Sequence, residues 1–266
     1  MKKLYFLIFT ILISAASFGQ VIIAEDFTYP DASLVANSAW ETEGGVAEDL
    51  LVSSGQAVVQ HGTPSEDAKL SFNAVTGNIY AAFDFSVDDL GAPFTGSDSE
   101  YFAHLGFNAR IDIENPTAAG DYTIGISTNT STAQATWATD LTYGQTYRIV
   151  VKYDQVGGVA DLWLNPANEM DTSISGGVDT TPGTITSFDL RQSDSSENET
   201  VRVDDLMVGQ TFNDVLVFAA QTNPSITLTS PSSSTVFNPG TTSVNLTWTT
   251  ANLTGNEFVN VIVNMG

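Results

Sequence analysis

Residues 144–165 read GQTYRIVVKYDQVGGVADLWLN, and this stretch decides the fold class. Between Tyr147 and Tyr153 every second side chain is large and apolar, which is the pattern of a strand with one buried face. Gly157 and Gly158 follow, and paired glycines favour the positive φ values that tight hairpin turns need. The alternation then resumes through Leu164. The stretch therefore predicts one long antiparallel β-hairpin.

Segments of the same kind recur up to residue 212, separated by runs rich in Gly, Asn, Asp and Ser. Apolar residues do not recur at helical spacing in this region. Together these features predict an all-β fold, an antiparallel jelly-roll β-sandwich. The expected strands are 21–27, 50–53, 57–60, 68–73, 79–87, 101–113, 122–127, 146–154, 159–165, 185–192 and 200–208.

The first 20 residues have the layout of a secretory signal peptide. Lys2 and Lys3 precede an apolar run at residues 4–18, and the small residues Ser17 and Gly19 mark a cleavage site near residue 20. The run is shorter than the roughly 20 residues that a transmembrane anchor needs. We therefore expect an exported, secreted chain with no direct insertion into a membrane.

Three parts follow: a main domain at residues 21–212, a linker at 213–222 and a β unit at 223–266. An apolar piece at residues 215–219 reads as an extra edge strand. The last unit has two or three short strands separated by Pro, Gly and Ser, which is how an immunoglobulin-like (Ig-like) domain begins. Such a domain needs about 100 residues, so we expect the polypeptide to continue past Gly266.

The composition is strongly acidic, with 31 Asp and Glu, 8 Lys and Arg, and a formal net charge of −23. Nucleic acids and anionic membranes bind basic patches, so neither is expected as a partner. The chain has no cysteine. An exported protein without disulfides must be held together by its core or by bound metal.

The hairpin resembles a motif of laminin G-like and concanavalin A-like jelly-roll modules. Gly144, Tyr147, Val151, Tyr153 and Asp154 match its first strand, and the sequence LWLN at 162–165 matches its second. The segment VRVDDLMVG at 201–209 is similar to their closing strand, and residues 25–34 are similar to the opening strand of such modules in secreted proteins of the Bacteroidota type. The resemblance covers about residues 21–212 and implies a recognition module without naming its ligand.

The sequence lacks the common catalytic patterns. Laminarinase-type glycosidases of this fold carry a Glu-x-Asp-x-x-Glu strand, and neither that spacing nor a Gly-x-Ser-x-Gly elbow nor a His-Glu-x-x-His motif occurs. His61 and His104 are the only histidines, and both are expected to be structural. We therefore expect no enzyme within these residues.

Calcium is the cofactor that the carboxylates favour, because Ca²⁺ takes six to eight oxygen ligands. The first and last strands of a jelly roll commonly lie together, which would bring Asp26 and Glu25 close to Asp204 or Asp205. Strand alternation would allow only one of that last pair to join Asp26. The alternative is that all of these are solvent-facing acids. A loop with acids at 88, 89, 98 and 100 is a weaker second candidate.

Sugar binding needs an exposed aromatic ring with polar groups around it. Trp163 is the strand candidate because alternation places it opposite Leu162, and Trp137 and Trp40 are loop candidates. Arg110 is a rare cation that would hold a carboxylate, although structural ion pairing is its alternative role. Core packing is the alternative for each tryptophan.

These observations predict a secreted, non-catalytic binding module for an extracellular glycan or cell-surface polysaccharide, with Ca²⁺ as a structural ion. Two alternatives stay open. In the first, the chain is the accessory N-terminal region of a secreted hydrolase whose catalytic domain lies beyond residue 266. In the second, it is a purely structural adhesin or spacer.

Overall fold

The computed structural model describes residues 21–96, 100–195, 197–218, 225–230 and 247–251. The chain forms two compact units, residues 1–219 and 220–266, and each is described by itself. The predicted signal peptide at residues 1–20 lies outside the described residues, as does most of the predicted Ig-like unit.

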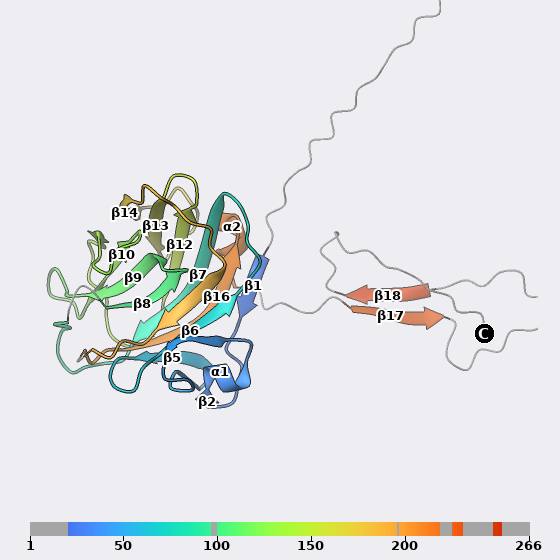
Figure 1. The fold of residues 1–266 in the computed structure, drawn as a ribbon, viewed down its shortest axis with the longest axis horizontal. Helices are drawn as coiled ribbons and strands as arrows, with labels where there is room; N and C mark the ends of the chain where they lie inside the picture. Colours follow the sequence, from blue (N-terminus) through green and yellow to red (C-terminus); the bar gives the residue numbers. More distant parts are fainter. Residues whose placement is uncertain (1–20, 97–99, 196, 219–224, 231–246, 252–266) are drawn as a thin grey trace, which may run out of the picture. The chain divides into compact units, whose positions relative to one another are not determined.

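The first unit consists of two antiparallel sheets that enclose one core (Figure 1). For each sheet the strands are given in the order in which they lie side by side. Sheet A has nine strands, with β1 (Val21–Glu25) pairing β16 beside the row β14 (Ser173–Val178), β13 (Val159–Leu164), β12 (Tyr147–Asp154), β7 (Asn78–Val87), β16 (Thr200–Gly209), β5 (Gln56–Gln60), β4 (Leu51–Ser53) and β2 (Ala32–Ser33). Sheet B has seven, in the order β11 (Ala135–Thr136), β10 (Thr123–Ser127), β9 (Asn108–Glu114), β8 (Tyr101–Leu105), β15 (Ser187–Arg191), β6 (Glu66–Ser71) and β3 (Glu41–Gly45). The jelly-roll β-sandwich predicted from the sequence is therefore confirmed.

The hairpin predicted at residues 144–165 is present as β12 and β13. Its strands pair from Ile149 with Leu164 to Asp154 with Val159. Only the second of the two turn glycines, Gly158, has a positive φ, of 67°. A Cβ there would lie 2.1 Å from the Asp179 carbonyl oxygen, so this position needs glycine.

Alternation along the strands places one set of side chains between the sheets. On β12, Ile149, Val151 and Tyr153 are buried in this main core. The ring of Phe83 on sheet A contacts Phe102 and Phe188 of sheet B, with centroids 6.2 and 5.6 Å away. These aromatic contacts join the two layers.

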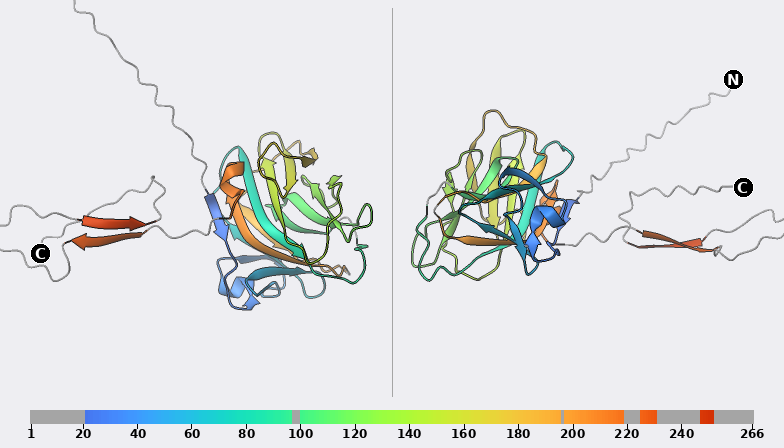
Figure 2. Two further views of the ribbon diagram at one scale, coloured as in Figure 1. Left: turned by 180° about the vertical axis from the view of Figure 1, so that it is seen from behind. Right: turned by 60° about the horizontal axis from the view of Figure 1, so that its bottom comes forward.

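A second, smaller core covers the outer side of sheet A, beneath the helix α2 (Phe212–Val215). Figure 2 shows α2, in orange, against β7 and β16. The buried members of this core are Tyr80, Ala82, Val150, Trp163, Met207, Phe212 and Val215. Arg148 fastens the helix by donating hydrogen bonds to the carbonyls of Val215 and Leu216, at 2.9 and 3.1 Å. The edge strand expected at 215–219 is therefore wrong for the described residues, because Val215 ends a helix.

The long strand expected at 101–113 is also wrong, because β8 and β9 form a hairpin there. The turn lies at Gly106 and Phe107, between the paired residues Leu105 and Asn108. Both turn residues have positive φ, 50° and 66°, as in the tight turns that match strand twist. Two strands thus replace one, and Phe107 stands at the tip between them.

Four strands were not expected: β2, β3, β11 and β14. In each sheet the strands at both ends of the row belong to this set. Sequences such as ETEGG in β3 and SISGGV in β14 carry glycines and no apolar alternation, because an edge strand buries little. The other helix, α1 (Leu34–Asn37), follows β2 and is capped by the Ser33 hydroxyl, which accepts from the Ala36 amide at 3.2 Å.

The second unit contains one described antiparallel pair, β17 (Ser225–Ser230) and β18 (Thr247–Ala251). Among the described residues of the whole chain, neither four-residue helix has the length or apolar content to cross a bilayer.

Candidate functional site

Two of the three predicted stacking tryptophans lie in the cores. Trp40 is 2% exposed, packs between Phe27 and Phe188, and donates its indole N–H to Glu25 at 3.2 Å. Trp163 is 4% exposed and meets Phe212 of α2 edge-on, with centroids 5.3 Å apart. Neither ring is accessible to a sugar, so both predictions are wrong. Alternation did place Trp163 outside the main core, but α2 covers that side of sheet A.

Trp137 follows the edge strand β11 and is half-buried, packed against the main core. Its amide donates to the Ile124 carbonyl at 2.8 Å, which fixes its backbone on the edge of sheet B. Of the three predicted tryptophans it is the one that is not buried.

The strand pairing behind the calcium prediction is present, because β1 pairs with β16 and Glu25 lies opposite Leu206. The Glu25 carboxylate, however, is only 7% exposed and already accepts three hydrogen bonds. The donors are the Phe27 amide, the Tyr29 hydroxyl and the Trp40 indole, at 2.8, 2.8 and 3.2 Å. Glu25 therefore holds the start of the domain together, and its place among the calcium ligands is a wrong prediction.

The charge of Asp26 acts on Asp205, and the Asp205 amide donates a hydrogen bond to the Asp204 carboxylate at 2.8 Å. A bulge at Asp204 and Asp205 interrupts strict alternation, and Asp205 has a φ of 50°. Burial raises the pKa of Asp205; Asp84 and Asp26 raise it further, while Arg148 lowers it. Burial raises the pKa of Asp204 to about 6, opposed by the Asp205 amide hydrogen bond and assisted by the Asp205 and Asp84 charges. The bulge thus directs both carboxylates toward a shared acidic neighbourhood, which alternation did not anticipate.

Two acids of the loop that was the second calcium candidate form ion pairs with arginines. Asp88 forms a two-point ion pair with Arg202, at 2.7 and 2.9 Å, and Glu100 pairs with Arg191 at 3.1 Å. Residue 98 lies outside the described residues.

Within the described residues, two groups of potential metal ligands converge to within 4.8 Å: Glu43, His104 and Asp189, and His61, Glu197 and Glu199. In both, the histidine Nδ1 accepts a backbone N–H, from Phe107 at 2.8 Å and from Ser193 at 2.9 Å. A neutral imidazole that accepts at Nδ1 carries its hydrogen on Nε2, whereas a ligating histidine binds metal with one nitrogen and donates from the other. Neither imidazole is therefore arranged as a metal ligand.

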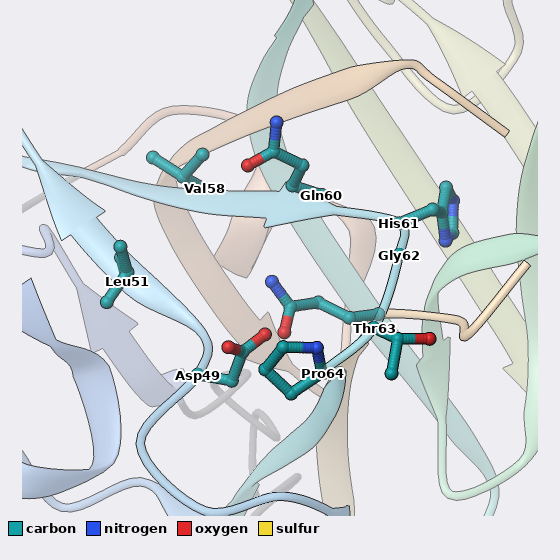
Figure 3. A pocket seen from close by; sticks show the side chains of 9 residues that line it. Asp49, Leu51, Val58, Gln60, His61, Gly62, Thr63 and Pro64 are labelled. Carbon is teal, nitrogen blue, oxygen red and sulfur yellow. The ribbon is translucent and has the colours of Figure 1, made fainter. Parts of the chain in front are cut away.

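His61 borders a pocket of about 290 Å³ at the end of β5 (Figure 3). In the view shown, Leu51 and His61 lie at opposite ends of the labelled side chains. His61 Nε2 lies 3.0 Å from Glu199 Oε1, with both side chains 1% exposed, and the Gln192 side chain accepts the Glu66 amide at 3.0 Å. These groups are used within the fold, and apart from the His61 imidazole no aromatic ring or basic side chain lines the pocket.

The outer side of sheet B is different in character. Its central strands present titratable and aromatic side chains in place of a covering helix. We call this surface the polar face, and it comprises Glu43 on β3, Lys69 on β6, Asp189 and Arg191 on β15, Tyr101 and His104 on β8, Phe107 in the turn and Arg110 on β9. In the strand register Asp189 lies between Lys69 and His104.

The polar face positions the β8–β9 turn. The Gly106 amide donates to Asp189 Oδ2 at 3.1 Å, and the Phe107 amide donates to His104 Nδ1 at 2.8 Å. The Phe107 ring stacks on the His104 ring, with centroids 4.9 Å apart and planes inclined by 21°. Phe107 is nevertheless 46% exposed. Its left-handed backbone is strained for a large side chain, and such strain concentrates at functional positions.

The electrostatics under this turn are set by burial. Burial, assisted by the hydrogen bond that its protonated carboxyl donates to Glu43, raises the pKa of Asp189 to about 8, so Asp189 is largely protonated at neutral pH. Burial, with the charges of Arg110 and Arg191, lowers the pKa of His104 to about 3. At neutral pH the floor of the face is therefore a neutral imidazole and a protonated acid beneath an exposed ring.

A guanidinium lies on each side of the neighbouring ring. Tyr101 has Arg110 at 4.6 Å and Arg191 at 4.4 Å from its ring centroid, supplied by the strands on either side of β8. Arg110 also donates from Nε to the Phe107 carbonyl at 2.8 Å. The Arg110 guanidinium therefore contacts both the Tyr101 ring and the backbone of Phe107, the residue whose own ring is exposed.

No family model matches the chain, and no curated protein matches it. Several solved structures do. A Lotus tetragonolobus seed lectin is 12% identical, covers 70% of this chain and 97% of its own, and has a TM-score of 0.43. Peanut lectin with a nine-residue peptide is 14% identical, with coverages of 71% and 97% and a TM-score of 0.45. Lectin II from Ulex europaeus is 16% identical, with coverages of 72% and 100% and a TM-score of 0.43. These proteins share too little sequence with the chain, and superpose on it too loosely, to transfer a ligand or a metal site.

Sequence reasoning therefore selected Arg110 and missed Phe107, His104 and Asp189 as parts of one surface. A signal for the turn was present, because Gly106 interrupts the expected strand, and an isolated glycine in a strand pattern marks a bulge or turn.

Proposed function

We propose that the chain is a non-catalytic carbohydrate-binding module that holds an extracellular glycan on the polar face, with Phe107 as the stacking ring. The observation that supports this most is Phe107 itself. A large aromatic side chain occupies a left-handed turn position where glycine or asparagine would be unstrained, and 46% of it is exposed.

Carbohydrate suits this surface better than a purely apolar ligand. A pyranose has an apolar face that stacks on a ring and hydroxyls that need nearby donors and acceptors. Around Phe107 those groups are the Arg110 guanidinium and, along the same face, the half-buried Lys69 and Glu43. The pocket near His61 has polar groups but lacks the ring.

The test is retention of the purified protein on a panel of immobilised polysaccharides, run with Ca²⁺ and with chelator. Phe107→Ala should weaken retention on the bound polymer at least about tenfold, which is a typical loss for an aromatic hot spot. Leu51→Ala is the matched control, because Leu51 is 47% exposed and lines the rival pocket. The proposal fails if no polysaccharide is retained, or if Leu51→Ala weakens retention and Phe107→Ala does not.

Calcium is a second proposal, restricted to Asp26, Asp204 and Asp205. It is supported by the pairing of β1 with β16 and by the mutual influence of the Asp26 and Asp205 charges. Ca²⁺ should raise the melting temperature of the protein, and Asp205→Asn should remove that rise. An equal rise in the variant would place any calcium elsewhere.

We also propose that the protein is exported, supported by the charged and apolar pattern of residues 1–20. The accessory-region hypothesis and the structural-spacer hypothesis differ in their consequences. A spacer has no affinity for any polysaccharide, whereas an accessory region of a hydrolase keeps the Phe107-dependent retention and is linked to an active site elsewhere in a longer polypeptide.

A further inference from the structure

Among the basic side chains that the structure describes, Arg110 is the one that forms no ion pair with a described carboxylate. Six lysines and arginines lie in the described part of the chain, and five of them have a carboxylate oxygen within 4.0 Å. The pairs are Lys69–Glu43, Arg148–Asp84, Lys152–Asp161, Arg191–Glu100 and Arg202–Asp88. Among the described residues Arg110 forms no such pair.

The missing partner is notable because acids are abundant. The chain has 31 acidic residues against 8 basic ones, and Asp112 and Glu114 follow Arg110 on the same strand with the same parity. The Arg110 side chain is instead held by neutral groups, through its Nε contact with the Phe107 carbonyl at 2.8 Å and its position 4.6 Å from the Tyr101 ring centroid. Within the described residues its two terminal nitrogens form no hydrogen bond, so they are placed to meet an external acceptor.

The surroundings reduce the negative charge that a ligand would meet. Burial, assisted by a hydrogen bond to Glu43, raises the pKa of Asp189 to about 8, so Asp189 is largely neutral at pH 7, and Lys69 lies 3.5 Å from the Glu43 carboxylate. Arg191 is neutralised by Glu100, while His104 is uncharged. Among the described residues, Arg110 is therefore the cation of the polar face without a carboxylate oxygen within 4.0 Å, although Asp112 and Glu114 lie on the same side of β9.

We infer that the glycan bound at Phe107 carries an anionic oxygen group, a carboxylate or a sulfate ester, which the terminal nitrogens of Arg110 hold in a two-point hydrogen bond. This inference rests on the proposed function and narrows it to acidic polysaccharides. The planar guanidinium fork matches the oxygen spacing of both groups, and a fixed Nε leaves less side-chain freedom to lose on binding. Phe107 would supply the stacking surface and Arg110 the selectivity.

The experiment uses two matched pairs of polysaccharides. Polygalacturonate is compared with its carboxyl-reduced form, and a sulfated galactan with its desulfated form, by titration calorimetry with the purified protein. We expect one acidic polymer to bind about ten- to a hundredfold more tightly than its neutral counterpart, as for a charge-assisted pair. The polymer pair that shows the preference identifies the acid group.

Three variants locate the effect. Arg110→Gln should remove the preference for the acidic polymer while leaving weaker, Phe107-dependent binding. Arg110→Lys keeps the charge without the fork and should retain only part of the preference. Arg202→Gln is the control, because it removes one positive charge from β16 in sheet A. Melting temperatures confirm that each variant is folded.

The outcomes separate the two proposals. Equal affinity for the acidic and neutral members of both pairs, with binding still lost in Phe107→Ala, overturns this inference and leaves the proposed function standing. A preference that Arg202→Gln reduces as much as Arg110→Gln also overturns it, since general charge then explains the effect. Binding to none of the four polymers, nor to any other polysaccharide of the panel, overturns the proposed function and this inference together.

Discussion

The outer sides of the two sheets differ in what covers them. On sheet A, α2 covers Trp163, Tyr80 and Val150 and makes a second apolar core. On sheet B, no helix in the described residues covers the central strands, and buried titratable groups support an exposed ring instead. The same strand geometry thus serves structure on one side and, we propose, recognition on the other.

The comparison shows what strand alternation can reveal. Alternation states which side of a sheet a residue is on, but it does not state what covers that side. Alternation correctly placed Trp163 on the other side of the sheet from Leu162. The burial of Trp163 depends on α2, a distant segment of the chain that Arg148 holds against the sheet. The covering element has only four helical residues, so it left no periodic signal.

The largest expected effect separates the two tryptophans. Trp163→Ala should lower the free energy of unfolding by about 3–5 kcal/mol, because it opens a cavity under α2. Trp137→Ala, at a half-buried edge position, should cost clearly less. Urea unfolding of both variants measures the difference, and neither change should affect the fold of the polar face. If Trp163→Ala were stable and lost glycan retention instead, Trp163 would be the stacking ring after all.

The next effect concerns the buried acid under the turn. The folded-state pKa of Asp189 is raised from 3.8 to about 8, so the folded state keeps a proton that the unfolded state releases. This contribution to stability is fully present below about pH 4 and is lost as the pH rises to about 8, with a slope of at most about 1.4 kcal/mol per pH unit. Asp189→Asn retains a donor toward Glu43 and does not titrate.

Unfolding free energies of the native protein and Asp189→Asn, measured from pH 5 to 9, test this. The native protein should lose stability relative to the variant as the pH rises, and the difference should level off above about pH 8. His104 acts in the opposite direction, since its pKa is lowered to about 3 and its contribution is lost as the pH falls from about 6.5. A pH-independent difference between the two proteins would show that the pKa of Asp189 is not raised in the folded state.

A smaller effect tests the strain at the turn. Phe107→Gly should be about 1 kcal/mol more stable than Phe107→Ala, because only glycine takes the φ of 66° without penalty. Both variants should lose retention on polysaccharide equally. Thermal unfolding measures the difference in stability between the two variants. Equal stabilities would mean that the turn relaxes and stores no strain.

The fold was largely predictable and the site was not, for physical reasons. Interior strands such as β7 and β12 place every second side chain in the main core and are therefore recognisable from the sequence, whereas β3 and β14 lie at sheet edges and are not. The approach of β1 to β16 was predicted from topology. Phe107 was missed because its exposure arises from a turn inside what read as one continuous strand. Its supports, His104 and Asp189, meet only through the strand order of sheet B.

The most direct measurement is a map of amide chemical shifts as an oligosaccharide of the best-retained polysaccharide is titrated into the protein. The account predicts the largest shifts at Gly106, Phe107, Arg110 and Tyr101, with residues of β12 and β13 unchanged. Shifts centred on residues 49–64, around the pocket near His61, would contradict this prediction and move the binding site to strands β4 and β5 of the opposite sheet.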